Sequence, residues 1–206
     1  IQEYVLAEYG KKAKLIAYGA DHTCKEALSI AVQNQFPFLT EKYAFKVCRI
    51  EPENNVHTIL EAFSEYPLLK IVLVGNWYNS DYGKQLKLEF NTYENIYLLE
   101  PIYNQNILNQ LRSNCYLYIH GHSAGGTNPS LVEAMYLELP ILAYDVPYNL
   151  ETTHQKALYF NDSKTLTSLL KSVQDHDLVK TSKALKAIAD EFYTWDIITK
   201  QYASLF

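Results

Sequence analysis

A glycine pair before a predicted helix start is the part of this sequence best suited to chemistry. An apolar run at 115–120 leads to Gly125 and Gly126, and Asn128 and Pro129 are residue types that begin helices. The turn therefore predicts free N–H groups at the positive end of a helix, an arrangement that suits a phosphate. An ordinary glycine turn before a core helix would have the same pattern, so both interpretations stay open.

Glu133 lies about one turn into that helix, which is otherwise apolar nearly all round. Its carboxylate must therefore occupy a narrow solvent-exposed stripe or be buried with a partner. Helical side chains lean toward the N-terminus, and Glu133 shares the face of Pro129 near the helix start. A carboxylate at this position can accept hydrogen bonds from two vicinal hydroxyls, such as those of a ribose.

Arg49, His120 and His122 each follow or end an apolar run. Arg49 is either half of a surface salt bridge with Glu51 or Glu53, or a clamp for a diphosphate, which guanidinium geometry favours. A histidine at a strand end near a phosphate is expected to donate a hydrogen bond or to pack. We expect no metal, because the histidine spacing has no accompanying cysteine or acid cluster.

Several other chemistries are excluded by what the sequence lacks. It has no carboxylate pair typical of glycoside hydrolases, no G-x-S-x-G serine and no G-x-x-x-x-G-K-[ST] loop. The glycine turn also lacks the G-x-G-x-x-G spacing of dinucleotide-binding proteins. With a net charge of −5 and no basic tract, the 206-residue chain is not expected to bind nucleic acid.

The elements that must position these residues alternate along most of the chain. Short apolar segments predict strands, and segments with helical spacing lie between them. Strands are predicted at 15–18, 43–49, 69–74, 96–99, 115–120, 141–144 and 157–160. Helices are predicted at 4–9, 56–63, 82–90, 105–111, 128–137, 166–173, 178–192 and 195–205, and the segment 25–36 is ambiguous.

This alternation predicts an α/β fold with a Rossmann-like, doubly wound parallel sheet and extra C-terminal helices. A hydrophobic content of 48% is enough for a sizeable core. Ligands bind such sheets at the carboxyl ends of the strands, where Arg49, Gly75, 100–103, 121–130 and Asp145 lie.

Cellular context is constrained by three further features of the sequence. No stretch approaches the roughly 20 apolar residues that span a bilayer, and we recognise no signal peptide. Three scattered cysteines without metal or disulfide spacing favour a reducing compartment. The chain starts at Ile1 and not at methionine, so we expect it to be a piece of a longer protein.

Four motifs, in this order, resemble the C-terminal, nucleotide-sugar-binding domain of retaining GT-B enzymes of glycosyltransferase family 4. Within that family the chain looks most similar to a bacterial rhamnosyltransferase-like subgroup. The motifs are RIEPENN at 49–55, VLVG at 72–75, GGTNPSLVEAM at 125–135 and PILA at 140–143. The resemblance implies that 1–40 are the end of an N-terminal domain with a hinge, and that 41–206 are the donor-binding domain.

The resemblance also implies roles for individual residues. Arg49 would neutralise the leaving diphosphate and Glu133 would bind ribose hydroxyls, and these are the expected catalytic residues. Ile102 and Tyr103 would contact the base. The other expected substrate-binding residues are Asn54, Gly75, His122, Gly125, Gly126, Thr127, Asn128, Pro129 and Ser130.

Two positions depart from the usual family pattern. Gly125 stands where the family has the first of two glutamates separated by seven residues, and Asn54 replaces a lysine. Because deoxysugars lack hydroxyls, the loss of a glutamate suits rhamnose, and dTDP-rhamnose is a candidate donor.

The implied reaction is transfer of a sugar from a nucleoside diphosphate to a glycan acceptor, with retained anomeric configuration and no metal or other cofactor. Two alternatives stay open: a nucleotide-sugar epimerase of GT-B architecture, and a non-catalytic nucleotide-sugar-binding domain. The acceptor would bind to the absent N-terminal half, so this fragment is expected to bind donor weakly and not to catalyse transfer alone. The subgroup implies polysaccharide biosynthesis in the cytoplasm or at the inner face of the bacterial membrane, with any membrane contact made by the absent half.

Overall fold

The computed structural model describes residues 2–206, which contain a single six-stranded sheet with every neighbouring pair parallel. The strand order is β3-β2-β1-β4-β5-β6. The strands are β1 (Tyr43–Val47), β2 (Lys70–Val74), β3 (Ile96–Leu99), β4 (Leu117–His120), β5 (Ile141–Tyr144) and β6 (Leu158–Phe160). Their residues are mostly apolar because helices cover both faces of the sheet.

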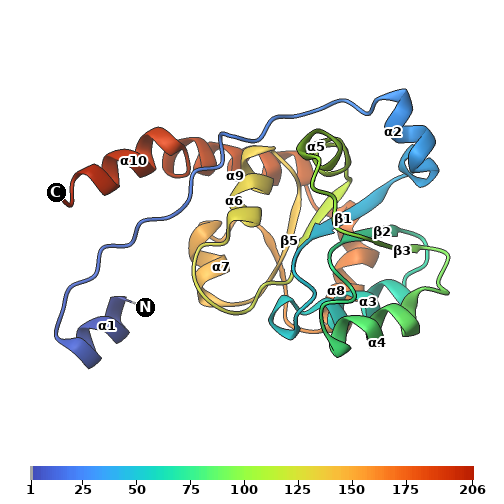
Figure 1. Cartoon of the computed structure of the whole chain (residues 1–206), viewed down its shortest axis with the longest axis horizontal. Helices are drawn as coiled ribbons and strands as arrows, with labels where there is room; N and C mark the ends of the chain where they lie inside the picture. Colours follow the sequence, from blue (N-terminus) through green and yellow to red (C-terminus); the bar gives the residue numbers. More distant parts are fainter. Residues whose placement is uncertain (1) are drawn as a thin grey trace.

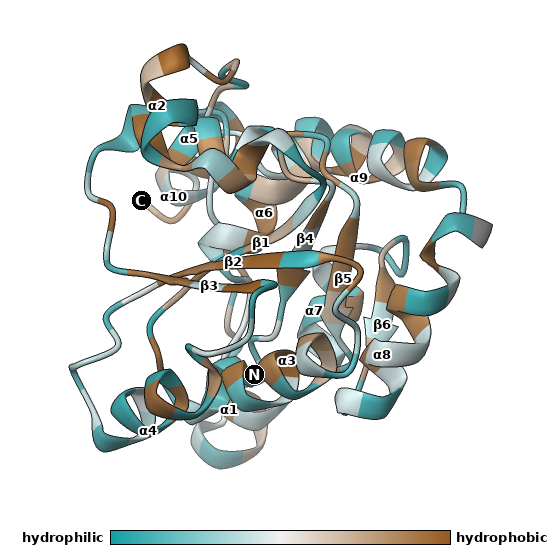
Figure 2. Ribbon diagram, turned by 90° about the vertical axis from the view of Figure 1, so that its right-hand side faces the viewer, coloured by the Kyte–Doolittle hydropathy of each residue, from teal (hydrophilic) through white to brown (hydrophobic). Residues whose placement is uncertain are grey.

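Two helical layers enclose the sheet (Figure 1, Figure 2). One face packs against α5 (Gln105–Ser113), α6 (Pro129–Tyr136) and α9 (Leu178–Phe192). The opposite face packs against α3 (Val56–Ser64), α4 (Asp81–Phe90) and α8 (Ser163–Ser172). Successive strand residues point to opposite faces, so Phe45 belongs to the first core cluster and its neighbour Ala44 to the second.

The remaining elements lie at the periphery of these layers. They are α1 (Gln2–Tyr9), α2 (Ile30–Gln35), η1 (Pro37–Thr40), η2 (Pro52–Asn54), α7 (Pro147–Thr152), η3 (Val173–Asp175) and α10 (Trp195–Ala203). Residues 10–29 connect α1 to α2 without helix or strand and cross the α9–α10 side of the molecule (Figure 1). There the amide of Ala20 donates to the carbonyl of Tyr193 at 2.7 Å.

The predicted fold class is confirmed, but the predicted strand at 15–18 is wrong. This segment has no strand beside it in the described sheet, so its backbone cannot form a hydrogen-bonded ladder. The ambiguous segment 25–36 contains only the short helix α2, which begins after Ser29. Helix α7 was not predicted, because six residues starting at Pro147 are too few to display a helical period.

The strand order reverses between β1 and β4. From β1 the chain continues to β2 and β3 on one side, whereas β4, β5 and β6 follow on the other. The connections after β1 and β4 therefore diverge and leave a crevice at the carboxyl ends of these strands, where ligands of doubly wound sheets bind.

Gly83 allows α4 to pack against the loop that carries Trp77. A Cβ at position 83 would lie 2.5 Å from the carbonyl oxygen of Trp77. The Trp77 indole is fully buried, and its Nε1 donates to the carbonyl of Leu99 at 2.9 Å. The loop therefore has little freedom to move away from an added methyl group.

We expect Gly83→Ala to lower the free energy of unfolding by about 1–3 kcal/mol, because overpacking displaces the backbone. At an unhindered helix position the same change would raise it by up to roughly 1 kcal/mol. Urea denaturation followed by circular dichroism measures the difference. The control Lys84→Ala, at the exposed next residue, should stay within about 0.5 kcal/mol of wild type. A stabilised Gly83→Ala protein would contradict the packing.

Candidate functional site

The loops that follow β1 and β4 are joined by backbone and side-chain hydrogen bonds. The Asn55 side-chain amide donates to the carbonyl of Gly121 at 2.8 Å, and the Ser123 amide donates to the carbonyl of Glu53 at 2.8 Å. A Cβ on Gly121 would lie 2.4 Å from the carbonyl oxygen of Asn54, so only glycine permits this approach. The two loops therefore form one fixed floor for the crevice.

Asn54, predicted to bind substrate, lies on this floor and is largely engaged by the protein. Its side-chain nitrogen donates to the carbonyl of Arg49 at 3.0 Å, and its oxygen lies 3.2 Å from Nδ1 of His122. Burial lowers the pKa of His122, and the neighbouring Lys46 lowers it further. Asn54 thus positions the β1 loop and His122 without adding charge.

The glycine turn leads into α6 as the sequence predicts. Asn128 is the N-cap and its side-chain oxygen accepts a hydrogen bond from the Ser130 amide at 3.0 Å, while Pro129 is the first helical residue. Gly125 has a φ of +101°, which favours glycine. Within residues 2–206, no hydrogen bond is made by the amides of Gly125, Gly126, Thr127 and Asn128. These donors are available to a ligand at the positive end of the helix.

Glu133 is partly buried, with 18% of its side chain exposed, and it has partners, as in the second of the two arrangements its apolar helix allows. One carboxylate oxygen pairs with Arg112 on α5, and the other accepts from Nε2 of His22 at 2.9 Å. Arg112 is only 2% exposed, also bonds Asn109 at 3.0 Å, and leaves its Nε without a partner in the described structure. The His22 ring is about half exposed, so this contact is the more easily replaced.

Arg49 lies at the exit of β1 with 77% of its side chain exposed. Its Nε lies 3.5 Å from a carboxylate oxygen of Glu51, which is the salt-bridge interpretation offered by the sequence. An exposed pair of this kind contributes little to stability, so the guanidinium can turn toward a ligand at small cost.

Two buried basic side chains complete the crevice. Lys46 on β1 and His120 at the end of β4 are each 2% exposed. Burial holds the pKa of His120 well below its ordinary value of 6.5, and Lys46 and His122 contribute to the shift. His120 is therefore neutral at physiological pH, and its Nε2 lacks a hydrogen-bond partner among the described residues.

These residues line a cavity of about 330 Å³, here called the basic cavity. It brings together the predicted site residues Arg49, Asn54, His122, Asn128, Pro129, Ser130 and Glu133. It also contains Lys46, Arg112 and His120. The basic cavity therefore lies at the reversal of strand order, between the start of α6 and the exit of β1.

The other predicted residues line two further cavities. Gly75, Ile102 and Tyr103 line a cavity of about 360 Å³, the edge cavity, which shares Arg49 and Cys48 with the basic cavity. Gly75 is required there for packing as well, because a Cβ would lie 2.6 Å from the carbonyl oxygen of Cys48.

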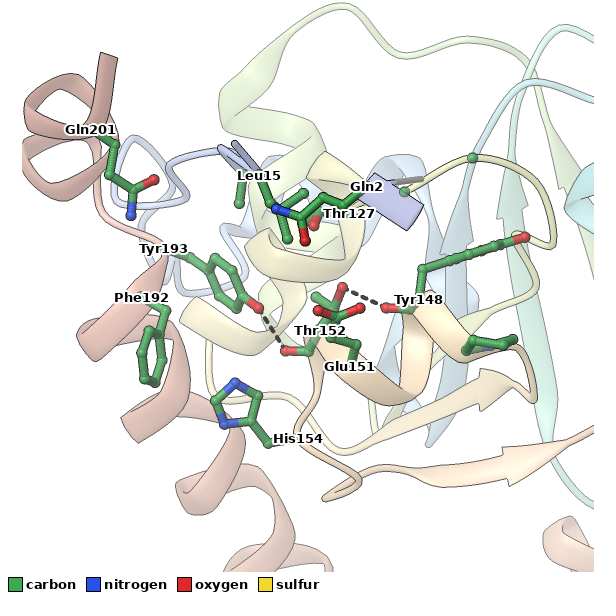
Figure 3. A pocket seen from close by; sticks show the side chains of 14 residues that line it. Gln2, Leu15, Thr127, Tyr148, Glu151, Thr152, His154, Phe192, Tyr193 and Gln201 are labelled. Atoms are coloured by element: carbon green, nitrogen blue, oxygen red, sulfur yellow. Dashed lines mark hydrogen bonds between the residues drawn. The ribbon is translucent and has the colours of Figure 1, made fainter. Parts of the chain in front are cut away.

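Gly125, Gly126 and Thr127 line a separate side cavity of about 340 Å³ (Figure 3). Its opposite walls come from α7, the end of α9 and the N-terminal segment. Tyr193 Oη donates to the carbonyl of Thr152 at 3.0 Å across its base. The glycine turn thus separates the side cavity from the basic cavity.

Sequence reasoning missed Lys46, Arg112 and His22 as members of the site. Lys46 had a signal, because a lysine inside a strand expected to be buried on both faces is unusual. Arg112 had none, since its partner Glu133 lies 21 residues away and only the packing of α5 beside α6 brings the two together.

A comparison with protein families identifies the class of this chain. The model of the family described as glycosyl transferases group 1 matches residues 30–186. The chain belongs to this family. No curated protein sequence matches significantly.

Solved structures show the same fold for this group 1 glycosyltransferase domain. Sucrose-phosphate synthase from Thermosynechococcus elongatus is 16% identical with a TM-score of 0.77, and the match covers 98% of this chain and 55% of that one. HepE from Anabaena, solved with UDP-glucose, is 18% identical with a TM-score of 0.75, covering 93% and 56%. The pneumococcal O-GlcNAc transferase GtfA, solved with UDP and GlcNAc, is 18% identical with a TM-score of 0.65, covering 98% and 42%.

These likenesses confirm the Rossmann-like fold, with GT-B enzymes as structural neighbours. The chain spans about half the length of the first two structures it matches. In residues 2–206, no helix is long and apolar enough to cross a membrane. No group of three or more His, Cys, Asp or Glu side chains in this part of the chain is arranged to hold a metal ion.

The buried neutral His120 predicts an acid-dependent loss of stability. Its pKa is lower in the folded than in the unfolded chain, so unfolding takes up a proton and stability falls as the pH drops below about 6.5. Relative to His120→Gln, the wild type should lose about 1 kcal/mol of unfolding free energy between pH 7.5 and 5.5, measured by urea denaturation. The control Ser168→Ala, which changes an exposed position of α8 and removes no titratable group, should keep the wild-type pH profile. Parallel profiles for wild type and His120→Gln would contradict the prediction.

Proposed function

We propose that residues 41–206 bind a nucleoside-diphosphate sugar and form the donor half of a retaining glycosyltransferase of family 4. One observation carries the proposal: the start of α6 with the unbonded amide of Asn128, Arg49 and buried basic side chains line one cavity where the strand order reverses. Membership of the group 1 family supports it, as do the UDP-sugar complex of HepE and the UDP complex of GtfA.

The diphosphate would occupy the basic cavity. The amide of Asn128 and the positive end of α6 would bind the phosphate oxygens. Arg49 would leave Glu51 and form a bidentate contact with a phosphate, which its exposure permits. The sugar would lie next to the diphosphate, on the side of the glycine turn. The unbonded amides of Gly125 to Thr127, which line the side cavity, would bind it there.

The nucleoside would lie between Glu133 and the edge cavity. Arg112 holds one oxygen of Glu133, and a ribose hydroxyl would take the position of His22 on the other. The base would contact Ile102 and Tyr103 beside Gly75, next to the diphosphate because the two cavities share Arg49.

In the proposed reaction, the bond between the anomeric carbon and the β-phosphate oxygen breaks, and its electron pair passes to the departing diphosphate. The acceptor hydroxyl oxygen bonds to the anomeric carbon on the same face, and its proton passes to the departing phosphate oxygen. Arg49 and the helix dipole stabilise the growing negative charge, which preorganised groups of this kind typically do by roughly 3–4 kcal/mol each. Both groups belong to this chain, so it supplies the electrostatic stabilisation of the leaving diphosphate.

Rhamnose is the proposed donor sugar, and polysaccharide assembly in the cytoplasm or at the inner membrane face is the proposed setting. The support is Gly125, which offers backbone and no carboxylate to the sugar. A screen of dTDP-, UDP- and GDP-sugars tests the choice, and strict preference for glucose would contradict it. The acceptor site is proposed to lie outside this chain.

The test of the proposed function is calorimetric titration of the chain with UDP, dTDP and GDP. At least one should bind, and Arg49→Ala should weaken that binding about tenfold or more, because a charge-assisted contact is lost. Unfolding free energy should change little, since Arg49 is 77% exposed.

The control is Lys164→Ala, which removes an exposed cation on α8, on the opposite layer. It should bind nucleotide like the wild type. Wild-type protein that binds none of the three nucleotides would overturn the proposal. Sugar transfer by residues 1–206 alone would contradict the placement of the acceptor site.

A further inference from the structure

Lys46 is a buried lysine at the edge of the proposed donor site. It lies on β1, one residue before the strand ends, and only 2% of its surface is exposed. It lines the basic cavity together with Arg49, His120 and His122. Lysine is rarely buried this completely unless its ammonium is paired.

Within residues 2–206, Lys46 has no such pair. No carboxylate lies within 4.0 Å of its ammonium there, and no hydrogen bond contributes to its pKa. The titratable groups that interact electrostatically with Lys46 are Cys48, His120 and His122, and none of them is a carboxylate. Burial accordingly lowers the pKa of Lys46 from its ordinary value of 10.5.

An unpaired ammonium in a protein interior destabilises the fold, because its lost hydration is not replaced by a partner. The same cavity contains two fully buried nitrogens without partners, Nε2 of His120 and Nε of Arg112. Three strand and helix elements thus direct unsatisfied basic groups to one space, which makes an anion the missing partner.

Charge balance at the site points in the same direction. A sugar nucleotide has two adjacent phosphate groups, each negatively charged, and gains more charge on the leaving oxygen during transfer. Arg49 is mostly exposed and paired with Glu51, while Asn54 is neutral and bonded to the protein. When charged, Lys46 is screened by water much less than Arg49, because 2% of Lys46 but 77% of the Arg49 side chain is exposed.

We propose, on the basis of the function above, that the Lys46 ammonium is a second cationic contact of the donor diphosphate, acting beside Arg49. Lys46 then binds the donor and stabilises the leaving group. In the unbound protein the same ammonium is destabilising, because it has no partner. The ligand it recognises is the diphosphate and not the base, so its contribution should be the same for every nucleoside.

The test compares Lys46→Met with wild type, using UDP, UMP and uridine and the matching thymidine series as probes in calorimetry. Methionine matches the length of the lysine stem without its charge. Lys46→Met should weaken diphosphate binding about tenfold or more and leave nucleoside binding within about twofold. Its melting temperature should equal or exceed that of wild type, because the unpaired ammonium is gone.

Lys70→Met is the matched control. Lys70 lies at the start of β2, at the opposite ends of the strands from the basic cavity, and pairs with Glu41 at 2.5 Å. It should bind all probes like wild type. Side-chain ¹⁵N NMR of wild-type lysines, with the Lys46 signal assigned by its loss in Lys46→Arg, provides a measurement that does not depend on the methionine variant folding. UDP should shift that signal and uridine should not.

The outcomes separate the two proposals. If wild type binds none of the nucleotides, the proposed function fails and the role of Lys46 fails with it. If wild type binds UDP or dTDP and Lys46→Met binds it equally well, the role of Lys46 is refuted while donor binding stands. A Lys46 signal that does not respond to a diphosphate that binds wild type refutes it as well.

Discussion

The parallel pairing of β1 with β4 joins two strands whose following connections run in opposite directions, and the site depends on that divergence. No helix can cross the gap above the two strand ends, so backbone polar groups and the start of α6 face an open space. The gap would collapse or spread if the loops were loose. Hydrogen bonds from Asn55 and Ser123, and the close approach at Gly121, keep its floor at one width.

Electrostatics at this gap oppose stability. Lys46, His120 and Arg112 each place a basic group in the interior. Among the described residues, His120 and Arg112 each leave a ring or guanidinium nitrogen without a partner, and Lys46 has no ion pair. A protein selected only for folding would place apolar residues there. A ligand that pairs with these groups removes the destabilisation, and this gain contributes to the binding free energy. The same residues therefore determine both the affinity for the ligand and the stability of the unbound protein.

Much of the fold follows from sequence because apolar runs bounded by polar residues are local signals. The strands near β1 to β6 and the helix start at Asn128 and Pro129 could be predicted in this way. The segment 15–18 has the same local character but no neighbouring strand, which only the tertiary structure decides. The partners of Glu133 come from α5 and from the N-terminal segment, so no spacing along the chain announces Arg112 or His22. Lys46 is unusual as a lysine in an apolar strand, and the sequence shows this. Only the structure shows that no carboxylate lies beside it, which is the observation that points to an anionic ligand.

The backbone at Gly125 limits which residues the turn before α6 can accept. With a φ of +101°, this residue occupies a conformation in which any side chain is strained, although the space around it is open. A side chain introduced at 125 alone would therefore not simply add a contact, because the loop would first have to adopt another path. Residue type and loop geometry are linked at this position, so an engineered side chain there calls for a redesign of the turn from Gly125 to Asn128 as one unit.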